Sequence, residues 1–142
     1  MQVKFKKLHP DAIVPVYEKV GDAGLSLRSI EEKCIYPNEV DMVKTGISIE
    51  LPPGYEAQIR PRSGLALKHG VVVVNSPGTI DSNYRGEICV LLSTLMDESY
   101  TIDKGDAIAQ MVIAKHETVE FVEAEDLSET NRGADGFGST GK

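Results

Sequence analysis

The chain has 142 residues, a length that fits one domain and leaves little room for a second. Its 41% hydrophobic and 26% charged residues are typical of a globular protein and fit disordered, collagenous or membrane-embedded chains poorly. The 15 Lys and Arg against 22 Asp and Glu give a net charge of -7, which speaks against nucleic acid or an anionic membrane as the main partner. No apolar run reaches the length of a membrane span, and no apolar segment follows the basic N-terminus, so we expect a cytoplasmic protein.

Most of the chain reads as short strands separated by turn residues. In GISIELPPG, for example, Ile47, Ile49 and Leu51 alternate onto one face before two prolines and a glycine end the run. Short strands without helical crossovers of a dozen residues predict an all-β sandwich or barrel rather than a parallel α/β sheet. In chain order, strands are expected over residues 3–6, 25–28, 47–51, 56–59, 71–74, 88–92 and 108–113.

One short helix is predicted after the fourth of these strands. Ser63 is expected to cap a turn that runs through residues 65–68 and ends at Gly70. Because Arg60 and Arg62 precede it directly, helix N–H groups and two guanidinium groups would point to the same place, which suits an anion. This segment by itself favours the simpler interpretation, a capped connector with surface arginines.

Residues 71–92 consist of two apolar runs around a polar bend, VVVVNSPGTIDSNYRGEICVLL, and predict a hairpin. The bend contains a carboxamide, Asn75, a carboxylate, Asp81, and an aromatic ring, Tyr84. This combination could recognise a base edge, activate water and stack on a sugar. Taken alone, Asp81 is more typical of an Asx turn than of a general base.

The C-terminal part of the chain changes in composition. An acidic stretch follows residue 119, and the last twelve residues, NRGADGFGSTGK, are rich in glycine. Such a segment cannot build a core and loses much conformational entropy on ordering, so we expect a tail that is mobile until something holds it. We divide the chain into a β-rich core, residues 1–130, and a flexible tail, residues 131–142. In the tail, Arg132 and the hydroxyls of Ser139 and Thr140 can bind phosphate, and Phe137 is either a docking anchor or a stacking platform.

Five separated runs resemble, in order, the five motifs of the trimeric all-β dUTP pyrophosphatases, the dUTPases. They are DAGLSL (22–27), RPRSGLA (60–66), NSPGTIDSNYRGE (75–87), GDAIAQM (105–111) and RGADGFGSTG (132–141). The third and fifth runs are highly specific, whereas the fourth by itself is weak. The resemblance implies a single jelly-roll-like domain that forms a homotrimer with shared active sites, the tail of one subunit closing over a neighbour.

The resemblance also implies hydrolysis of dUTP to dUMP and pyrophosphate, which supplies dUMP and keeps uracil out of DNA. Asp81 would activate the water that attacks the α-phosphorus. Mg²⁺, the expected cofactor, would be held mainly by the triphosphate and would screen the charge of the substrate. At uracil, the implied substrate contacts are Asn75, Gly78 and Ile80, with Phe137 stacked on the ring, and Tyr84 would lie under the deoxyribose. At the phosphates, they are Arg62, Ser63, Gln110, Arg132, Ser139 and Thr140. Gly64 and Gly138 are further implied substrate contacts.

The first motif departs from the family pattern. It usually reads A-G-x-D-L, but here it reads AGLSL, with Ser26 in the place of the acid. That acid normally supports the network of metal-bound water and arginine around the phosphates. Serine brings no charge, so we expect weaker metal affinity or a less well oriented Arg62. Asp22 is the acid nearby in sequence that could compensate.

Three alternatives remain at this point. A dCTP deaminase would be longer and would resemble an R-S-S-x-x-R pattern, where this chain has RSGLALK. A non-catalytic dUTP sensor is compatible with Ser26, but a pure binder has no need of Asp81 beside a triphosphate. A structural β-domain with an interaction tail would leave the five ordered matches unexplained.

Overall fold

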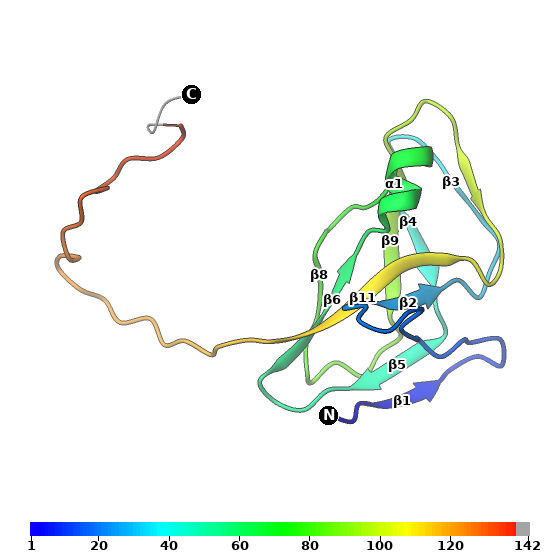
Figure 1. The fold of residues 1–142 in the computed structure, drawn as a ribbon, viewed down its shortest axis with the longest axis horizontal. Helices are drawn as coiled ribbons and strands as arrows, with labels where there is room; N and C mark the ends of the chain where they lie inside the picture. Colours follow the sequence, from blue (N-terminus) through cyan, green and yellow to red (C-terminus); the bar gives the residue numbers. More distant parts are fainter. Residues whose placement is uncertain (139–142) are drawn as a thin grey trace.

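The computed structural model describes residues 1–138, which form eleven strands and one helix (Figure 1). The prediction of an all-β fold with one short helix is therefore confirmed. The elements are β1 (Lys4–Lys7), β2 (Leu25–Arg28), β3 (Lys33–Ile35), β4 (Asp41–Lys44), β5 (Ile47–Glu50), β6 (Tyr55–Arg60), α1 (Ser63–His69), β7 (Val71–Val73), β8 (Gly78–Ile80), β9 (Cys89–Thr94), β10 (Tyr100–Ile102) and β11 (Ala107–Lys115).

The strands form four small antiparallel sheets. The largest has the order β2-β11-β6-β8, and a second has the order β4-β9-β7. Strands β1 and β5 form one pair, and β3 and β10 form another. The hydrogen bonding of residues 1–138 does not close into a barrel, so the sandwich form of the prediction describes the subunit better.

One hydrophobic core joins all four sheets. Alternate residues of β9 and most of the first half of β11 point inward, and Val90, Leu92 and Ile108 are almost completely buried. Burial of each such side chain contributes roughly 1.5–3 kcal/mol, so this core rather than local propensity holds the short strands in register.

Helix α1 begins one residue earlier than expected, at Ser63. Arg62 occupies the N-cap position with extended backbone angles, φ -92° and ψ 127°, and no side chain caps the helix. Extended angles are typical of an N-cap residue, and the guanidinium of Arg62 donates to the carbonyl of Ala107 at 2.7 Å. The prediction that Ser63 caps the helix is therefore wrong, whereas Gly70 does end it in the left-handed conformation, φ 63°. At 7 residues, this helix of the described chain is too short to span a bilayer.

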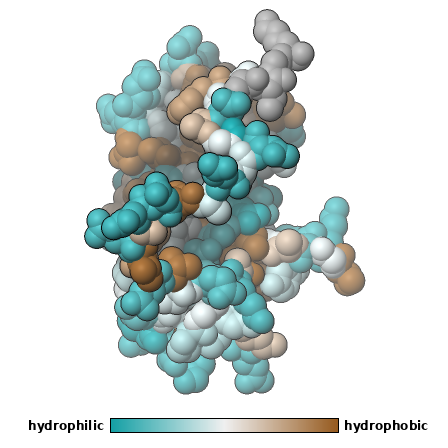
Figure 2. Space-filling view, turned by 90° about the vertical axis from the view of Figure 1, so that its left-hand side faces the viewer, coloured by the Kyte–Doolittle hydropathy of each residue, from teal (hydrophilic) through white to brown (hydrophobic). Residues whose placement is uncertain are grey.

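The regular structure ends with β11 at Lys115. Residues 116–138 contain no helix or strand and leave the body of the subunit as an extended segment, orange to red in Figure 1. Apolar side chains on this segment have no cover, and Phe121 is 95% exposed. Figure 2 shows the face of the molecule from which the segment departs, with apolar and hydrophilic side chains intermixed. The division at residue 130 stays a prediction.

Candidate active site

The bend between β7 and β9 brings the first group of expected site residues together. Strands β7 and β9 pair antiparallel, which confirms the predicted hairpin, and β8 leaves the bend to pair with β6. Gly78 lies against Asn75 and Ile59: a Cβ at this position would come 3.2 Å from the carboxamide nitrogen and 3.3 Å from the Ile59 Cβ. A larger residue than glycine would therefore force the Asn75 side chain away from the backbone of β8.

Asp81 follows β8 directly and is exposed. The turn after it is closed by main-chain atoms, since the N–H of Tyr84 donates to the carbonyl of Asp81 at 3.1 Å. No hydrogen bond to the carboxylate of Asp81 occurs within residues 1–138, so the Asx turn that its residue type favours is not formed. The carboxylate faces solvent, where it can accept a proton from a bound water.

Tyr84 is oriented by the segment that leads into β9. Its hydroxyl donates to the carbonyl of Glu87 at 2.9 Å, and its ring lies so close to Gly86 that a Cβ there would overlap it. Glu87 in turn accepts from the N–H of Gly46 at 2.7 Å. The hydrogen bond and the contact with Gly86 thus orient the ring of Tyr84, which is 43% exposed.

The second group lies at the start of α1. Register pairs Ser26 of β2 with Gln110 of β11, and Gln110 with Arg60 of β6, so these residues form one row across the sheet. The amide of Gln110 donates to the carbonyl of Pro61 at 3.0 Å, and Arg62 is anchored on the carbonyl of Ala107. Ser63 and Gly64 are exposed in the first turn of α1.

A small cavity of about 130 Å³ lies beside Arg62 and is also lined by Leu65, Tyr100 and Asp106. Burial raises the pKa of Tyr100 above its usual value, and the nearby carboxylates of Asp106 and Asp103 act in the same direction. Tyr100 is therefore a neutral wall of this cavity, and its ring stacks at 4.4 Å against that of His69.

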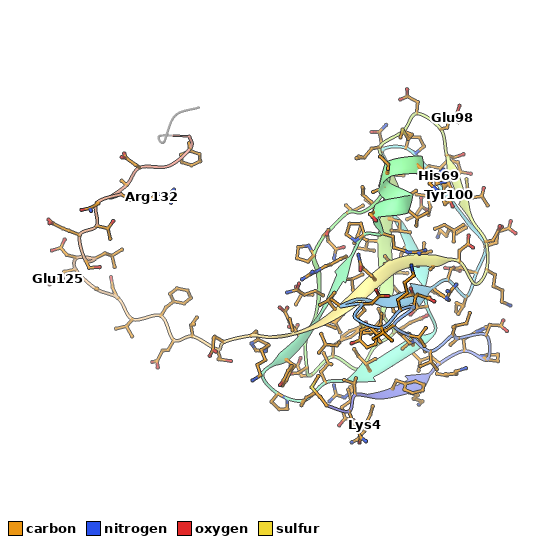
Figure 3. The ribbon with its side chains drawn as sticks, in the orientation of Figure 1. Lys4, His69, Glu98, Tyr100, Glu125 and Arg132 are labelled. Carbon is orange, nitrogen blue, oxygen red and sulfur yellow. The ribbon has the colours of Figure 1, made fainter. Side chains whose placement is uncertain are left out.

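Within one chain, the residues of the bend and the residues at the start of α1 lie apart. Ile80, the neighbour of Asp81, pairs with Ala57, whereas Arg62 follows the opposite end of β6. At the rise of about 3.3 Å per strand residue, the separation along β6 is roughly 15 Å. Arg132 lies on the extended segment, far from the labelled His69 and Tyr100 (Figure 3).

The tail residues form a third group, separate from the other two. Arg132 donates to the carbonyl of Asp135 at 2.9 Å, and Phe137 and Gly138 are exposed. Ser139 and Thr140 lie outside the described residues. The single chain therefore gathers the residues of the bend, the hairpin group, and separately gathers the residues at the start of α1, the helix group. It does not bring these two groups and the tail residues to one place.

A family model described as dUTPase matches residues 11–141 of this sequence. The chain belongs to the dUTPase family. A relative named deoxyuridine 5'-triphosphate nucleotidohydrolase from Helicobacter pylori (strain Shi470) is 52% identical over 99% of this chain and 97% of its own length. A protein of the same name from Nautilia profundicola is 54% identical over 100% of both chains.

Solved dUTPase structures have the same fold. A variant dUTPase of Staphylococcus bacteriophage 80alpha with bound dUpNHpp superposes with a TM-score of 0.91 at 27% identity, over 99% of each chain. A variant dUTPase from phage phi11 of S. aureus, 25% identical with a TM-score of 0.81 over 89% of this chain and 98% of its own, coordinates a structural Mg(II) ion. The expected family and fold are thereby confirmed.

The surroundings of Ser26 differ from the expectation for this family. Asp22 does not take the place of the acid, because its carboxylate accepts from the N–H of Lys19 at 2.9 Å within its own turn. Glu18, which sequence reasoning missed, instead lies 2.9 Å from the guanidinium of Arg28. No sequence signal marks Glu18, because only the pairing of Val16 with Ser26 brings its loop beside β2.

Proposed function

We propose that this dUTPase-family chain hydrolyses dUTP to dUMP and pyrophosphate. The observation that carries the proposal is the bend of residues 75–87, which carries a carboxamide, an exposed carboxylate without a hydrogen-bond partner among residues 1–138, and an aromatic ring whose hydroxyl is hydrogen-bonded. A water molecule beside Asp81 would give its proton to the carboxylate and attack the α-phosphorus. The bond from the α-phosphorus to its bridging oxygen would break, and pyrophosphate would leave.

Recognition of the nucleoside is assigned to the same hairpin. Asn75 and the backbone of Gly78 and Ile80 would hydrogen-bond the uracil edge, since the missing side chain of Gly78 lets the Asn75 carboxamide lie against the backbone of β8. The ring of Tyr84 would pack under the deoxyribose and leave no room for a 2′-hydroxyl. The hydrogen bond from its hydroxyl to the carbonyl of Glu87 supports this role, because steric exclusion requires an oriented ring.

Replacing Gly86 by Ala is expected to reduce the preference for dUTP over UTP by roughly ten-fold, because the new Cβ would push the Tyr84 ring out of place. The ratio of kcat/KM for the two nucleotides measures this. An unchanged ratio would contradict the assignment of Tyr84 to sugar selection.

Binding of the substrate phosphates is assigned to the residues at the start of α1 and to the tail. Arg62, Ser63, Gly64 and Gln110 would bind near the scissile bond, and the tail residues Arg132, Phe137, Gly138, Ser139 and Thr140 would close over the nucleotide. Within residues 1–138, no group of three or more His, Cys, Asp or Glu side chains could hold a metal ion. We therefore propose that Mg²⁺ reaches the site on triphosphate oxygens, where it supplies charge neutralisation.

A homotrimer with shared sites would bring the three groups together. The separation of Asp81 from Arg62 along β6 and the departure of the tail from its own body both support this assembly. Closing the tail would exclude bulk water at the cost of ordering a glycine-rich segment. A cytoplasmic location stays a prediction from the sequence.

Pyrophosphate release from dUTP, dTTP, dCTP and UTP, each with and without Mg²⁺, tests the proposal. Turnover is expected with dUTP and Mg²⁺, and with the other nucleotides at least ten-fold slower. Tight binding of dUTP without turnover would instead favour the non-catalytic sensor, which the absence of an acid at Ser26 keeps as the second candidate.

A further inference from the structure

A loop outside the expected motifs lies against the row that Ser26, Gln110 and Arg60 form across the sheet. The N–H of Ser26 donates to the carbonyl of Val16 at 2.9 Å, and the two residues form an isolated antiparallel bridge. This bridge extends the row of Ser26, Gln110 and Arg60 by one position. It also sets Glu18, two residues beyond Val16, beside strand β2.

Glu18 faces the side chains of β2 that point toward this loop. Its carboxylate Oε1 accepts from Arg28 Nη2 at 2.9 Å. Ser26 and Arg28 are two residues apart on β2, so their side chains lie on the same face of the strand. The carboxylate from the loop thus meets the face on which Ser26 brings no charge.

Arg28 transmits this contact to the start of β11. Its Nη1 donates to the carbonyl of Gly105 at 2.9 Å, and the N–H of Gly105 donates to the carbonyl of Ser29 at 2.8 Å. Between Ala107 and Ala109 the register of β11 on β2 shifts, as at a β-bulge. Such irregularities redirect side chains next to sites and need neighbours that hold them in place.

The bulge in turn anchors Arg62. The carbonyl of Ala107, two residues after Gly105, accepts from Arg62 Nη1 at 2.7 Å. A continuous series of polar contacts and two peptide bonds therefore leads from Glu18 through Arg28 to the guanidinium that the proposed function assigns to the phosphates.

The charges of the site agree with this geometry. The guanidinium of Arg28 and the hydroxyl of Ser26 lower the pKa of the Glu18 carboxyl, and Arg62 acts in the same direction by its charge. Glu18 is therefore ionised at neutral pH. Its negative charge interacts favourably with both guanidinium groups, whereas β2 itself carries no acid.

We propose that Glu18 is a positioning residue of this enzyme, which holds Arg28 and the Gly105–Ala107 segment so that Arg62 meets the phosphates of the substrate. This inference rests on the proposed function. It assigns to the loop before the first motif the carboxylate that β2 lacks at Ser26.

The experiment must separate positioning from simple stabilisation. The side chains of Arg28 and Glu18 are 31% and 45% exposed, and pairs with such exposure add little to stability. Replacing Glu18 by Gln is expected to lower kcat/KM for dUTP about ten-fold and to weaken binding of dUpNHpp, with Tm within about 3 °C of the parent.

Moving the carboxylate from position 18 to position 26 tests whether the lost activity can be restored. In the variant with both Glu18→Gln and Ser26→Asp, the new acid shares a face with Arg28 and should restore most of the lost kcat/KM and affinity. Glu50→Gln is the matched control: Glu50 is 46% exposed and pairs with Lys4 at 3.1 Å. Lys4 lies at the opposite end of the molecule from His69 and Tyr100, as Figure 3 shows, so Glu50→Gln should match the parent.

A Glu18→Gln variant within two-fold of the parent in both kcat/KM and dUpNHpp affinity would overturn the inference, as would an equal loss in Glu50→Gln. A loss that Ser26→Asp fails to restore would also overturn it. If the parent binds dUpNHpp but does not hydrolyse dUTP, the proposed function fails, and the binding measurements still decide the role of Glu18.

Discussion

Replacing Asp81 by Asn is expected to lower kcat for dUTP hydrolysis by roughly 100- to 10,000-fold, the usual contribution of a general base. Asparagine keeps the shape of the side chain but cannot take up the proton of the attacking water. Because the exposed side chain of Asp81 makes no hydrogen bond or ion pair within residues 1–138, its replacement should leave Tm and the affinity for dUpNHpp nearly unchanged. Pyrophosphate release and calorimetric binding measure the two quantities.

The matched control is Asp97→Asn, which removes another exposed carboxylate, on the turn between β9 and β10. It should turn over dUTP like the parent. If Asp81→Asn keeps more than one tenth of the parental kcat, the base lies elsewhere and the proposed mechanism is wrong.

A chain that ends after Asn131 is expected to fold normally and to lose at least about 100-fold in kcat/KM for dUTP. The buried hydrophobic core lies between Ala12 and Met111, so the deleted residues contribute nothing to it. They supply, in our proposal, the arginine and the aromatic ring that close the site. Thermal unfolding and pyrophosphate release of the truncated chain test both parts, and normal turnover would contradict the closing role of the tail.

Mixed assemblies extend this test to the sharing of sites between subunits. Full-length Asp81→Asn subunits and truncated subunits should each be nearly inactive. Refolded together, they should regain turnover, because some sites would combine an intact Asp81 from one subunit with an intact tail from another. The same proteins mixed without refolding serve as the control. No gain on refolding would place Asp81 and the tail of each site on the same chain.

Four of the strands are absent from those expected from the sequence. Strands β3, β8 and β10 have three residues each and β4 has four, and none of them is an apolar run like that of β7. The helix cap was misplaced by one residue because Arg62 is held by Ala107, a residue 45 positions away. Neither feature is visible in a local window, since both depend on neighbours supplied by other strands.

The amino-acid sequence by itself determined the all-β class, the hairpin of residues 71–92, the helix end at Gly70 and membership in the dUTPase family. These features follow from side-chain alternation, turn residues and motif order, which are local properties. Only the tertiary structure decided which acid faces Arg28. Asp22 is closer in sequence to Ser26 but is bound in its own turn, whereas Glu18, 10 residues before Arg28, reaches it. The reason is that the bridge between Val16 and Ser26 fixes the loop path, and register across strands is set by the packing of the whole core.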